Sequence, residues 1–132
     1  MASFLLDTSV IVDTLNGKRG RAELLEALIR QEHALACCPI TITEVYAGMR
    51  PHEEIRTSGL LVSFQLFPVS FAVARLAGLL KRNYAKKGTT LAVTDVTIAA
   101  VAIHNKLSLM TDNTKDFPMP DLTLYPLPRA AH

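Results

Sequence analysis

The sequence has no tryptophan, only two cysteines and four histidines, and a net charge of only +2 across its 132 residues. The histidines are scattered, and neither HExxH nor CxxC occurs, so the common zinc-site patterns are excluded. No glycine-rich phosphate loop is present, which argues against an NTPase or a dinucleotide-binding enzyme. No apolar run approaches the ~20 residues that a membrane-spanning helix requires, so we expect no membrane span.

The two cysteines, Cys37 and Cys38, are neighbours in the chain. Adjacent side chains of a strand point to opposite faces, so a disulfide between these two is not expected. We interpret them as small buried residues of a reduced, cytoplasmic protein. Residues 1–7 carry no positively charged side chain ahead of their apolar run, which is unlike a signal peptide.

The composition is that of an ordinary globular protein, with 49% hydrophobic and 20% charged residues, so we expect residues 1–132 to form a single domain. Short apolar runs predict strands at 3–6, 34–38, 66–69, 107–111 and 122–125, the last at a sheet edge. Apolar residues at helical spacing predict helices that begin after Thr8 or Ser9, at Arg21, after Thr43, at Glu53, after Ser70 and after Thr94. This alternation predicts a three-layer α/β/α domain around a central, mainly parallel sheet of about four to five strands.

Acidic residues lie at the ends of several predicted strands or at the helix starts beside them. They are Asp7, Glu44, Asp95, Asp112 and Asp116. Ligands of open α/β sheets collect at the carboxyl ends of the strands, where gathered carboxylates repel each other. A hard divalent cation, Mg²⁺ or Mn²⁺, relieves that repulsion, activates water and stabilises the charge on a phosphodiester. The pattern therefore indicates metal-dependent hydrolysis of phosphodiester bonds.

Each acid also has an ordinary structural explanation. Asp7 could assist a helix cap. Glu44 and Asp95, each placed in a first helical turn, could favour the helix dipole. Asp112 and Asp116 could be plain turn residues. The predicted position of all five at strand-to-helix junctions of one rim favours the metal site.

Four segments resemble, in the family's order, the motifs of PIN-domain proteins of the VapC toxin type. They are LLDTSVIVD at 5–13, ITEVYAG at 42–48, TDVTIAA at 94–100 and LMTDNTKDF at 109–117. Each is weak alone, whereas the ordered set spans nearly the whole chain and is specific. The resemblance implies a Mg²⁺-dependent endoribonuclease, with Mn²⁺ as an alternative ion, that is the toxin of a type II toxin–antitoxin system. It also implies a VapB-type antitoxin as partner, a homodimer, and a higher assembly with the antitoxin.

By position, Asp7, Glu44 and Asp95 match the three core acids of the family. Many relatives carry an aspartate where this chain has Asn113, and others use the acid of the Asp-Phe pair, here Asp116. We assign Asp116 to the fourth position, with Asp112 and Asn113 as alternatives. The asparagine at position 113, where many relatives carry an aspartate, concerns the binding of a second metal ion and not of the first.

In the expected mechanism Asp7 and Asp95 hold the principal ion directly. Glu44 and Asp116 complete the negative pocket, partly through waters, because Mg²⁺ dehydrates reluctantly. Three nearby hydroxyls either orient these carboxylates or only cap local structure; they belong to Thr8, Ser9 and Thr111.

RNA binding requires local positive charge, and the sequence offers two basic clusters. One consists of Lys81, Arg82, Lys86 and Lys87, which could instead favour a helix dipole, and the other of Lys18, Arg19 and Arg21. Few aromatic side chains are available for base stacking, so we expect RNA shape to set the preference. The apolar faces at 45–49 and 55–61 could form a groove for an antitoxin helix, or belong to the core or a homodimer contact.

Two other functions stay open at the level of sequence. One is a DNA-directed or RNA-processing PIN nuclease without a toxin role. The other is a non-catalytic binding module whose acids merely cap helices. Cleavage of RNA compared with DNA separates the first from a toxin ribonuclease, and measurable metal binding separates the second.

Overall fold

Five short parallel strands form the centre of the fold. The computed structural model describes residues 2–128, in which the elements are β1 (Ser3–Leu6), α1 (Thr8–Leu15), α2 (Arg21–Arg30), β2 (Ala34–Cys37), α3 (Pro39–Gly48), η1 (Pro51–Glu53), α4 (Glu54–Ser63), β3 (Gln65–Leu66), α5 (Phe71–Lys86), α6 (Val93–Asn105), β4 (Ser108–Met110), η2 (Thr114–Asp116) and β5 (Thr123–Leu124). The strands pair in the order β3-β2-β1-β4-β5, and every pair is parallel. The predicted sheet of four to five strands is confirmed, with β5 at an edge. All strands therefore end at the same edge of the sheet.

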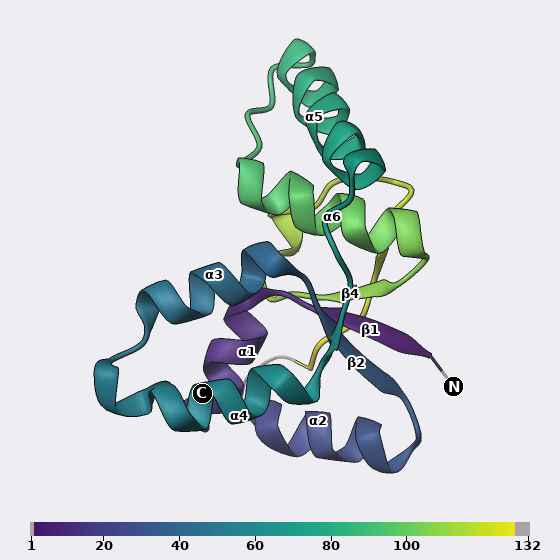
Figure 1. The fold of residues 1–132 in the computed structure, drawn as a ribbon. Coiled ribbons are helices and arrows are strands. Elements are labelled where there is room, and N and C mark those ends of the chain that lie inside the picture. Colours follow the sequence, from purple (N-terminus) through teal and green to yellow (C-terminus); the bar gives the residue numbers. More distant parts are fainter. Residues whose placement is uncertain (1, 129–132) are drawn as a thin grey trace.

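Side chains that alternate along the strands fill two separate cores. On β1, Leu5 packs into the core with α5 and α6, whereas Phe4 and Leu6 pack into the core with α1 and α2. Figure 1 shows the two helical layers on opposite sides of the sheet. Cys37 and Cys38 also divide between the two cores, and both are free and buried, as predicted.

Helix α6 is the most buried helix of the domain. Six of its residues are buried, and three of them are alanines (Ala99, Ala100 and Ala102). Small side chains let the helix lie close to the sheet on one side and to α5 on the other. This packing fixes the position of Asp95, which lies in the first turn of α6.

Two helices begin earlier than the sequence predicted. Helix α1 begins at Thr8 and is capped by Asp7, so the assignment of Thr8 or Ser9 as the cap is wrong. Helix α3 begins at Pro39, because the first position of a helix needs no N–H donor and a proline fits there. Thr43 therefore lies inside α3, where its hydroxyl donates to the Pro39 carbonyl oxygen at 3.2 Å, and it is not a cap.

Of the two remaining predictions of helix caps, one is confirmed and one is wrong. Ser70 caps α5 as predicted, since its hydroxyl oxygen accepts from the backbone N–H of Val73 at 3.2 Å. Thr94 does not cap α6, because that helix begins at Val93 after Ala92. No helix among residues 2–128 combines the length and the apolar character needed to cross a bilayer.

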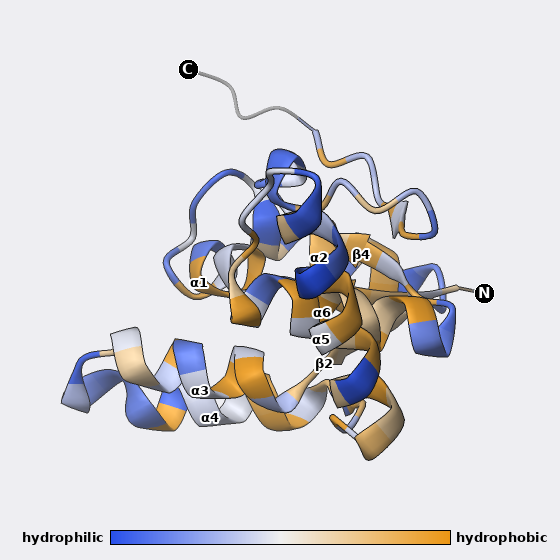
Figure 2. Cartoon of the chain, turned by 90° about the horizontal axis from the view of Figure 1, so that it is seen from above, coloured by the Kyte–Doolittle hydropathy of each residue, from blue (hydrophilic) through white to orange (hydrophobic). Residues whose placement is uncertain are grey.

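Helices α3 and α4 form an arm that projects from the sheet. Figure 2 shows both helices on one side of the molecule, away from α2 and β4. The hydroxyls of Tyr46 and Ser58 lie 2.7 Å apart and join α3 to α4. Val45 and Leu61 bury apolar side chains of the arm in the α1 and α2 core. The arm carries Glu44 to the edge where the strands end.

Candidate active site

Asp7 lies directly after β1, at the carboxyl edge of the sheet, and is 5% exposed. Its backbone N–H donates to the Met110 carbonyl oxygen at 2.9 Å, which ties it to β4. Its Oδ1 accepts from the backbone N–H of Thr8 at 2.8 Å, and its Oδ2 accepts from the hydroxyl of Thr111 at 2.7 Å. Each carboxylate oxygen thus accepts one hydrogen bond and keeps capacity for another partner. Asp7 is a cap and also a fixed, buried carboxylate.

Glu44 reaches the same place from α3. Its Oε1 accepts from the hydroxyl of Thr8 at 2.7 Å. Thr8 therefore contacts two acids, Asp7 through its N–H and Glu44 through its hydroxyl. Because α3 begins at Pro39, Glu44 lies in the second turn, so its predicted place in the first turn is wrong. The helix-dipole explanation does not apply to Glu44, since that effect is confined to the first and last turns.

Asp95 and Asp116 complete a group of four acids that we call the acidic rim (Asp7, Glu44, Asp95 and Asp116). Asp95 is partly buried at the start of α6, and Asp116 is partly buried at the end of η2. The pKa of Asp95 is raised to about 6, first by burial and then by the charges of Asp7, Asp116 and Glu44. Four segments distant in sequence thus bring three carboxylates within Coulombic reach of Asp95.

The environment of Asp7 contains opposing influences. Burial, the largest influence, raises its pKa, and the hydrogen bonds from Thr111 and Thr8 act in the opposite direction. The charges of Glu44 and Asp112 raise the pKa of Asp7 as well. Taken with Asp95, this means that the rim holds negative charge in a partly desolvated place, which a cation would relieve.

The donor set of the rim fits a hard divalent ion, since every donor is a carboxylate oxygen. The nearby Cys38 is no competing thiolate ligand, because burial raises the pKa of its thiol. Among residues 2–128, no group of three acidic, histidine or cysteine side chains lies close enough together to hold a metal ion by itself. This arrangement suits an ion held directly by one or two carboxylates, with water between it and the others.

The other predicted residues have different positions. Asn113 is exposed at the start of η2, and its backbone N–H donates to the Thr111 hydroxyl oxygen at 3.0 Å. Asp112 turns to a guanidinium, with its Oδ1 2.7 Å from Nη2 of Arg21. The hydroxyl of Ser9 is buried and has no hydrogen-bond partner among the described residues. Of the alternatives for the fourth acid, only Asp116 is among the charges that raise the pKa of Asp95.

Arg21 is the residue near the site that the sequence analysis misplaced. It was assigned to a surface cluster for RNA, but its side chain is only 2% exposed. It shares the buried face of α2 with Leu25 and Leu28, at helical spacing, and this periodicity could have identified it. Arg19 of the same cluster pairs with Asp13 at 3.6 Å and with Asp112 at 3.7 Å. These two arginines are therefore paired within the domain.

The basic cluster on α5 lies toward the start of α6. Lys81 donates through Nζ to the carbonyl oxygen of Leu91, four residues before Asp95. Lys87 lies over the ring of Tyr84, with Nζ 5.3 Å from its centroid. Arg82 and Lys86 are exposed, and neither has an ion pair among the described residues. Arg82 and Lys86 are thus exposed basic side chains in the last turns of the helix that precedes α6.

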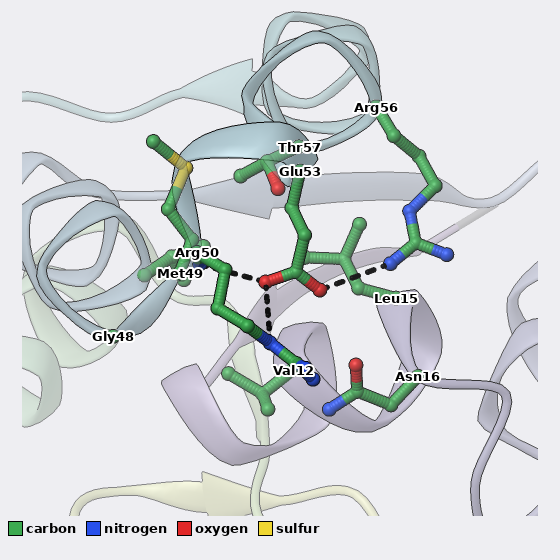
Figure 3. Close-up of a pocket in the computed structure, with 10 residues that line it drawn as sticks. Val12, Leu15, Asn16, Gly48, Met49, Arg50, Glu53, Arg56 and Thr57 are labelled. Atoms are coloured by element: carbon green, nitrogen blue, oxygen red, sulfur yellow. Dashed lines mark hydrogen bonds and ion pairs between the residues drawn. The ribbon is translucent and has the colours of Figure 1, made fainter.

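A cleft of about 200 Å³ lies between α1, α3 and the start of α4 (Figure 3). Its apolar lining includes Val12 and Leu15 from α1 and Met49 after α3. Glu53 lies among the lining side chains and pairs with Arg50 and Arg56 at 3.5 and 3.6 Å.

The cleft lies next to the acidic rim, along the same faces of α1 and α3. Val12 lies one turn beyond Thr8 on α1, and Gly48 lies one turn beyond Glu44 on α3, so both belong to the faces on which Thr8 and Glu44 meet.

The groove predicted between the faces at 45–49 and 55–61 is only partly present. Val45 and Met49 line the cleft, but the apolar side chains opposite them are Val12 and Leu15 of α1, and the segment 55–61 contributes only Arg56 and Thr57. Leu61 is buried and Leu60 packs beside it, so both belong to the core, which was the alternative weighed. Ile55 is 90% exposed and lines no part of the cleft. The Tyr46–Ser58 contact joins α3 to α4, so the cleft opens between this pair of helices and α1.

Comparison with known proteins agrees with this geometry. The model of the PIN domain family matches residues 4–119. The chain is 34% identical to ribonuclease VapC19 of Mycobacterium tuberculosis over 119 residues, which cover 89% of this chain and 95% of that protein.

Solved structures share the fold. A toxin–antitoxin complex from Klebsiella pneumoniae contains a chain that is 31% identical, with a TM-score of 0.71 and coverage of 93% of this chain and 96% of that one. The VapBC2 structure from Rickettsia felis, bound to a promoter DNA fragment, has a TM-score of 0.80 at 23% identity and covers 93% of this chain and 97% of that one. The second likeness concerns the fold alone.

Proposed function

The chain belongs to the PIN-domain family, in its VapC-type ribonuclease toxin branch, and we propose that it is a Mg²⁺-dependent endoribonuclease whose site is the acidic rim. One observation carries the assignment of the site. Thr8 hydrogen-bonds both Asp7 and Glu44, and the charges of these two acids and of Asp116 raise the pKa of Asp95. Members of this family are typically metal-dependent, and the all-oxygen donor set of the rim suits Mg²⁺, with Mn²⁺ as a substitute.

Different residues of the chain would bind the metal ion, orient its ligands and bind the RNA. Asp7 and Asp95 would hold the ion directly, while Glu44 and Asp116 would complete the pocket through water. Thr111 and Thr8 hold the Asp7 carboxylate in one orientation by hydrogen bonds to its two oxygens. A bound ion would supply positive charge for the phosphodiester and make water a stronger nucleophile. Arg82 and Lys86 would bind phosphates of the RNA chain on one side of the rim.

A direct experiment tests the nuclease and its substrate class together. Purified protein is incubated with total RNA, in Mg²⁺ and in EDTA, and the new RNA ends are mapped by sequencing. Single-stranded and duplex DNA are treated in parallel. We expect discrete RNA ends in Mg²⁺ alone. Cleavage of DNA in preference to RNA would favour the DNA-directed alternative, and absence of both cleavage and measurable metal binding would favour a non-catalytic module.

We further propose a VapB-type antitoxin as the partner, with one antitoxin segment that occupies both the cleft and the acidic rim. Apolar side chains of the segment would pack on Val12, Leu15 and Met49. An arginine about one helical turn along the segment would reach the carboxylates, because a guanidinium pairs with them bidentately. Such a segment would inhibit by placing a cation where the metal ion would bind.

The partner proposal is tested in cells and in the purified complex. The chain is expressed with and without its genomic neighbour, and growth is followed. We expect growth arrest only without the neighbour, and none for Asp7→Asn. Harmless expression of the wild-type chain alone, with no co-purifying neighbour, would contradict the toxin role while leaving the nuclease intact. Sedimentation of the free chain and of the complex tests the homodimer and higher assembly that the resemblance implies.

A further inference from the structure

A buried cation lies next to the acidic rim and is not part of it. The Arg21 side chain is 2% exposed, and its guanidinium crosses from α2 to the segment that follows β4. Nη2 of Arg21 is 2.7 Å from Oδ1 of Asp112 and also donates to the Pro128 carbonyl oxygen at 3.3 Å. Nη1 of Arg21 donates to the Arg19 carbonyl oxygen at 3.3 Å. One side chain therefore joins three segments that are distant in the sequence.

The partner of this cation is an acid that adjoins the site. Asp112 directly follows Thr111, whose hydroxyl holds Oδ2 of Asp7. The Asp112 charge is one of those that raise the pKa of Asp7, so Asp112 lies within Coulombic reach of the rim. Oδ1 of Asp112 faces two guanidinium groups, those of Arg21 and Arg19. Oδ2 of Asp112 is buried and has no hydrogen-bond partner among residues 2–128.

Five carboxylates thus lie near one another, and among residues 2–128 only Asp112 of the five forms an ion pair with a basic side chain. A buried guanidinium is stable only when it is paired, and a carboxylate that is paired with it is less available to an external ion. Without Arg21, Asp112 would keep only the longer contact with the half-exposed Arg19, and its charge would lie largely uncompensated one residue away from the contact that orients Asp7. The Arg21–Asp112 ion pair therefore affects which carboxylates are available to bind the ion.

We propose that Arg21 is a positioning residue of the nuclease site, which holds Asp112 out of the metal's coordination and cancels its charge at the acidic rim. The ion is then left to Asp7, Glu44, Asp95 and Asp116. This inference rests on the proposed metal-dependent function and adds to it a residue that acts through Asp112. It also assigns a function to an arginine that a surface RNA-binding role cannot explain, because its side chain is buried.

The test is a double-mutant cycle that removes the charges of Arg21 and Asp112 singly and together, which we call the charge cycle. The affinity for Mn²⁺ is measured by isothermal titration calorimetry at low ionic strength, where charge effects are least screened. The variants are Arg21→Met, Asp112→Asn and the double variant, with Arg30→Met as a matched control at the exposed far end of the same helix. Thermal melts of every variant in EDTA are recorded beside the titrations, and RNA cleavage is measured at saturating Mg²⁺.

The expected pattern has opposite signs in the two single variants. Arg21→Met frees a negative charge and should tighten Mn²⁺ binding by about three- to tenfold. Asp112→Asn leaves a positive charge and should weaken binding by a similar factor. The double variant should return to within about twofold of wild type, because both charges are gone. Arg30→Met should leave Mn²⁺ affinity unchanged.

Two results would overturn the inference. Equal Mn²⁺ affinity in all variants, with lower melting temperatures in the single ones, would make the pair a purely structural salt bridge. Loss of Mn²⁺ binding in both Asp112→Asn and the double variant, by more than about tenfold, would make Asp112 itself a ligand.

A second variant keeps the test decisive if Arg21→Met does not fold. Arg19→Met removes the half-exposed guanidinium from the same carboxylate without emptying a buried position. It should tighten Mn²⁺ binding relative to Arg30→Met, and equal affinities would overturn the inference. Failure of the proposed function is distinguishable, since a wild-type chain that binds no Mn²⁺ and cuts no RNA refutes both. A wild-type chain that does both, with a flat charge cycle, refutes this inference alone.

Discussion

Thr111 and Asp7, 104 residues apart in the chain, share a hydrogen bond of 2.7 Å between the threonine hydroxyl and Oδ2 of the aspartate. The contact joins the end of β4 to the end of β1, and these strands are neighbours in the sheet. Both residues are buried, so water does not readily replace the bond. The orientation of Asp7, which is the most buried acid of the rim, depends on this contact.

Replacement of Thr111 by valine should therefore slow cleavage by roughly tenfold, with the fold retained, because valine has nearly the same shape and lacks the donor. The lost bond lowers the pKa of Asp7 in the wild type, so that pKa should rise and the acid limb of the pH–rate profile should move to higher pH. Profiles of kcat against pH measure the shift. Thr97→Val is the matched control, since that hydroxyl donates only within α6, to the Val93 carbonyl oxygen. If the acid limb of the kcat profile of Thr111→Val stays at the wild-type pH, the orienting role of Thr111 is refuted.

Asp7→Asn and Asp95→Asn should each abolish cleavage while the protein stays folded. Each change keeps the shape of the side chain and removes the charge that would hold the ion. Cleavage assays and circular dichroism on the same preparations provide the measurement. Full activity in either variant would remove that residue from the site.

In EDTA, Asp95→Asn should melt a few degrees higher than wild type. Burial and three neighbouring charges raise the pKa of Asp95, so the folded protein is destabilised when this carboxyl group ionises. The favourable effect of a negative charge at the first turn of α6 opposes this gain and is smaller. A variant that melts clearly below wild type would show that Asp95 serves chiefly as a structural residue of the helix start.

The same raised pKa predicts how stability depends on pH without metal. Between the ordinary value of 3.8 and the folded value of about 6, the folded state binds more protons than the unfolded state. The free energy of unfolding should therefore fall as pH rises through this window. Urea titrations from pH 4 to pH 7 in EDTA give the slope, which Asp95→Asn should reduce and saturating Mg²⁺ should reverse in sign.

Arg82→Ser and Lys86→Ser should raise the KM for RNA and leave kcat nearly unchanged, because these exposed side chains would bind phosphates away from the reacting bond. Each should reduce the slope of log affinity against log salt by about one. Arg30→Ser, on the opposite helical layer, is the control. Unchanged KM and salt slope would mean that Lys86 serves the dipole of α5 and that RNA binds elsewhere.

The sequence by itself determined the elements that depend on local patterns. Short apolar runs located the strands, and apolar residues at a period of about 3.6 located most helices, within a few residues. The acids were assigned to the carboxyl edge of a parallel sheet. The predicted helix starts were less accurate where one residue is compatible with both the end of a strand and the beginning of a helix. Pro39 ends a strand and also begins α3, and only the packed chain selects between a start there and one at Thr43.

Tertiary structure alone decided which acids face one another. Asp112 and Asp116 lie four residues apart in one turn, and local pattern treats them alike. The charge of Asp116 raises the pKa of Asp95, whereas Asp112 is bound by Arg21, 91 residues away. An ion pair across that separation depends on how α2 packs beside β4, which no periodicity within either segment specifies. The cleft has the same origin, because α1, α3 and the start of α4, which are separate in the sequence, all contribute to its lining. Local periodicity fixes which face of a helix is apolar, and the packing of the whole chain fixes what that face meets.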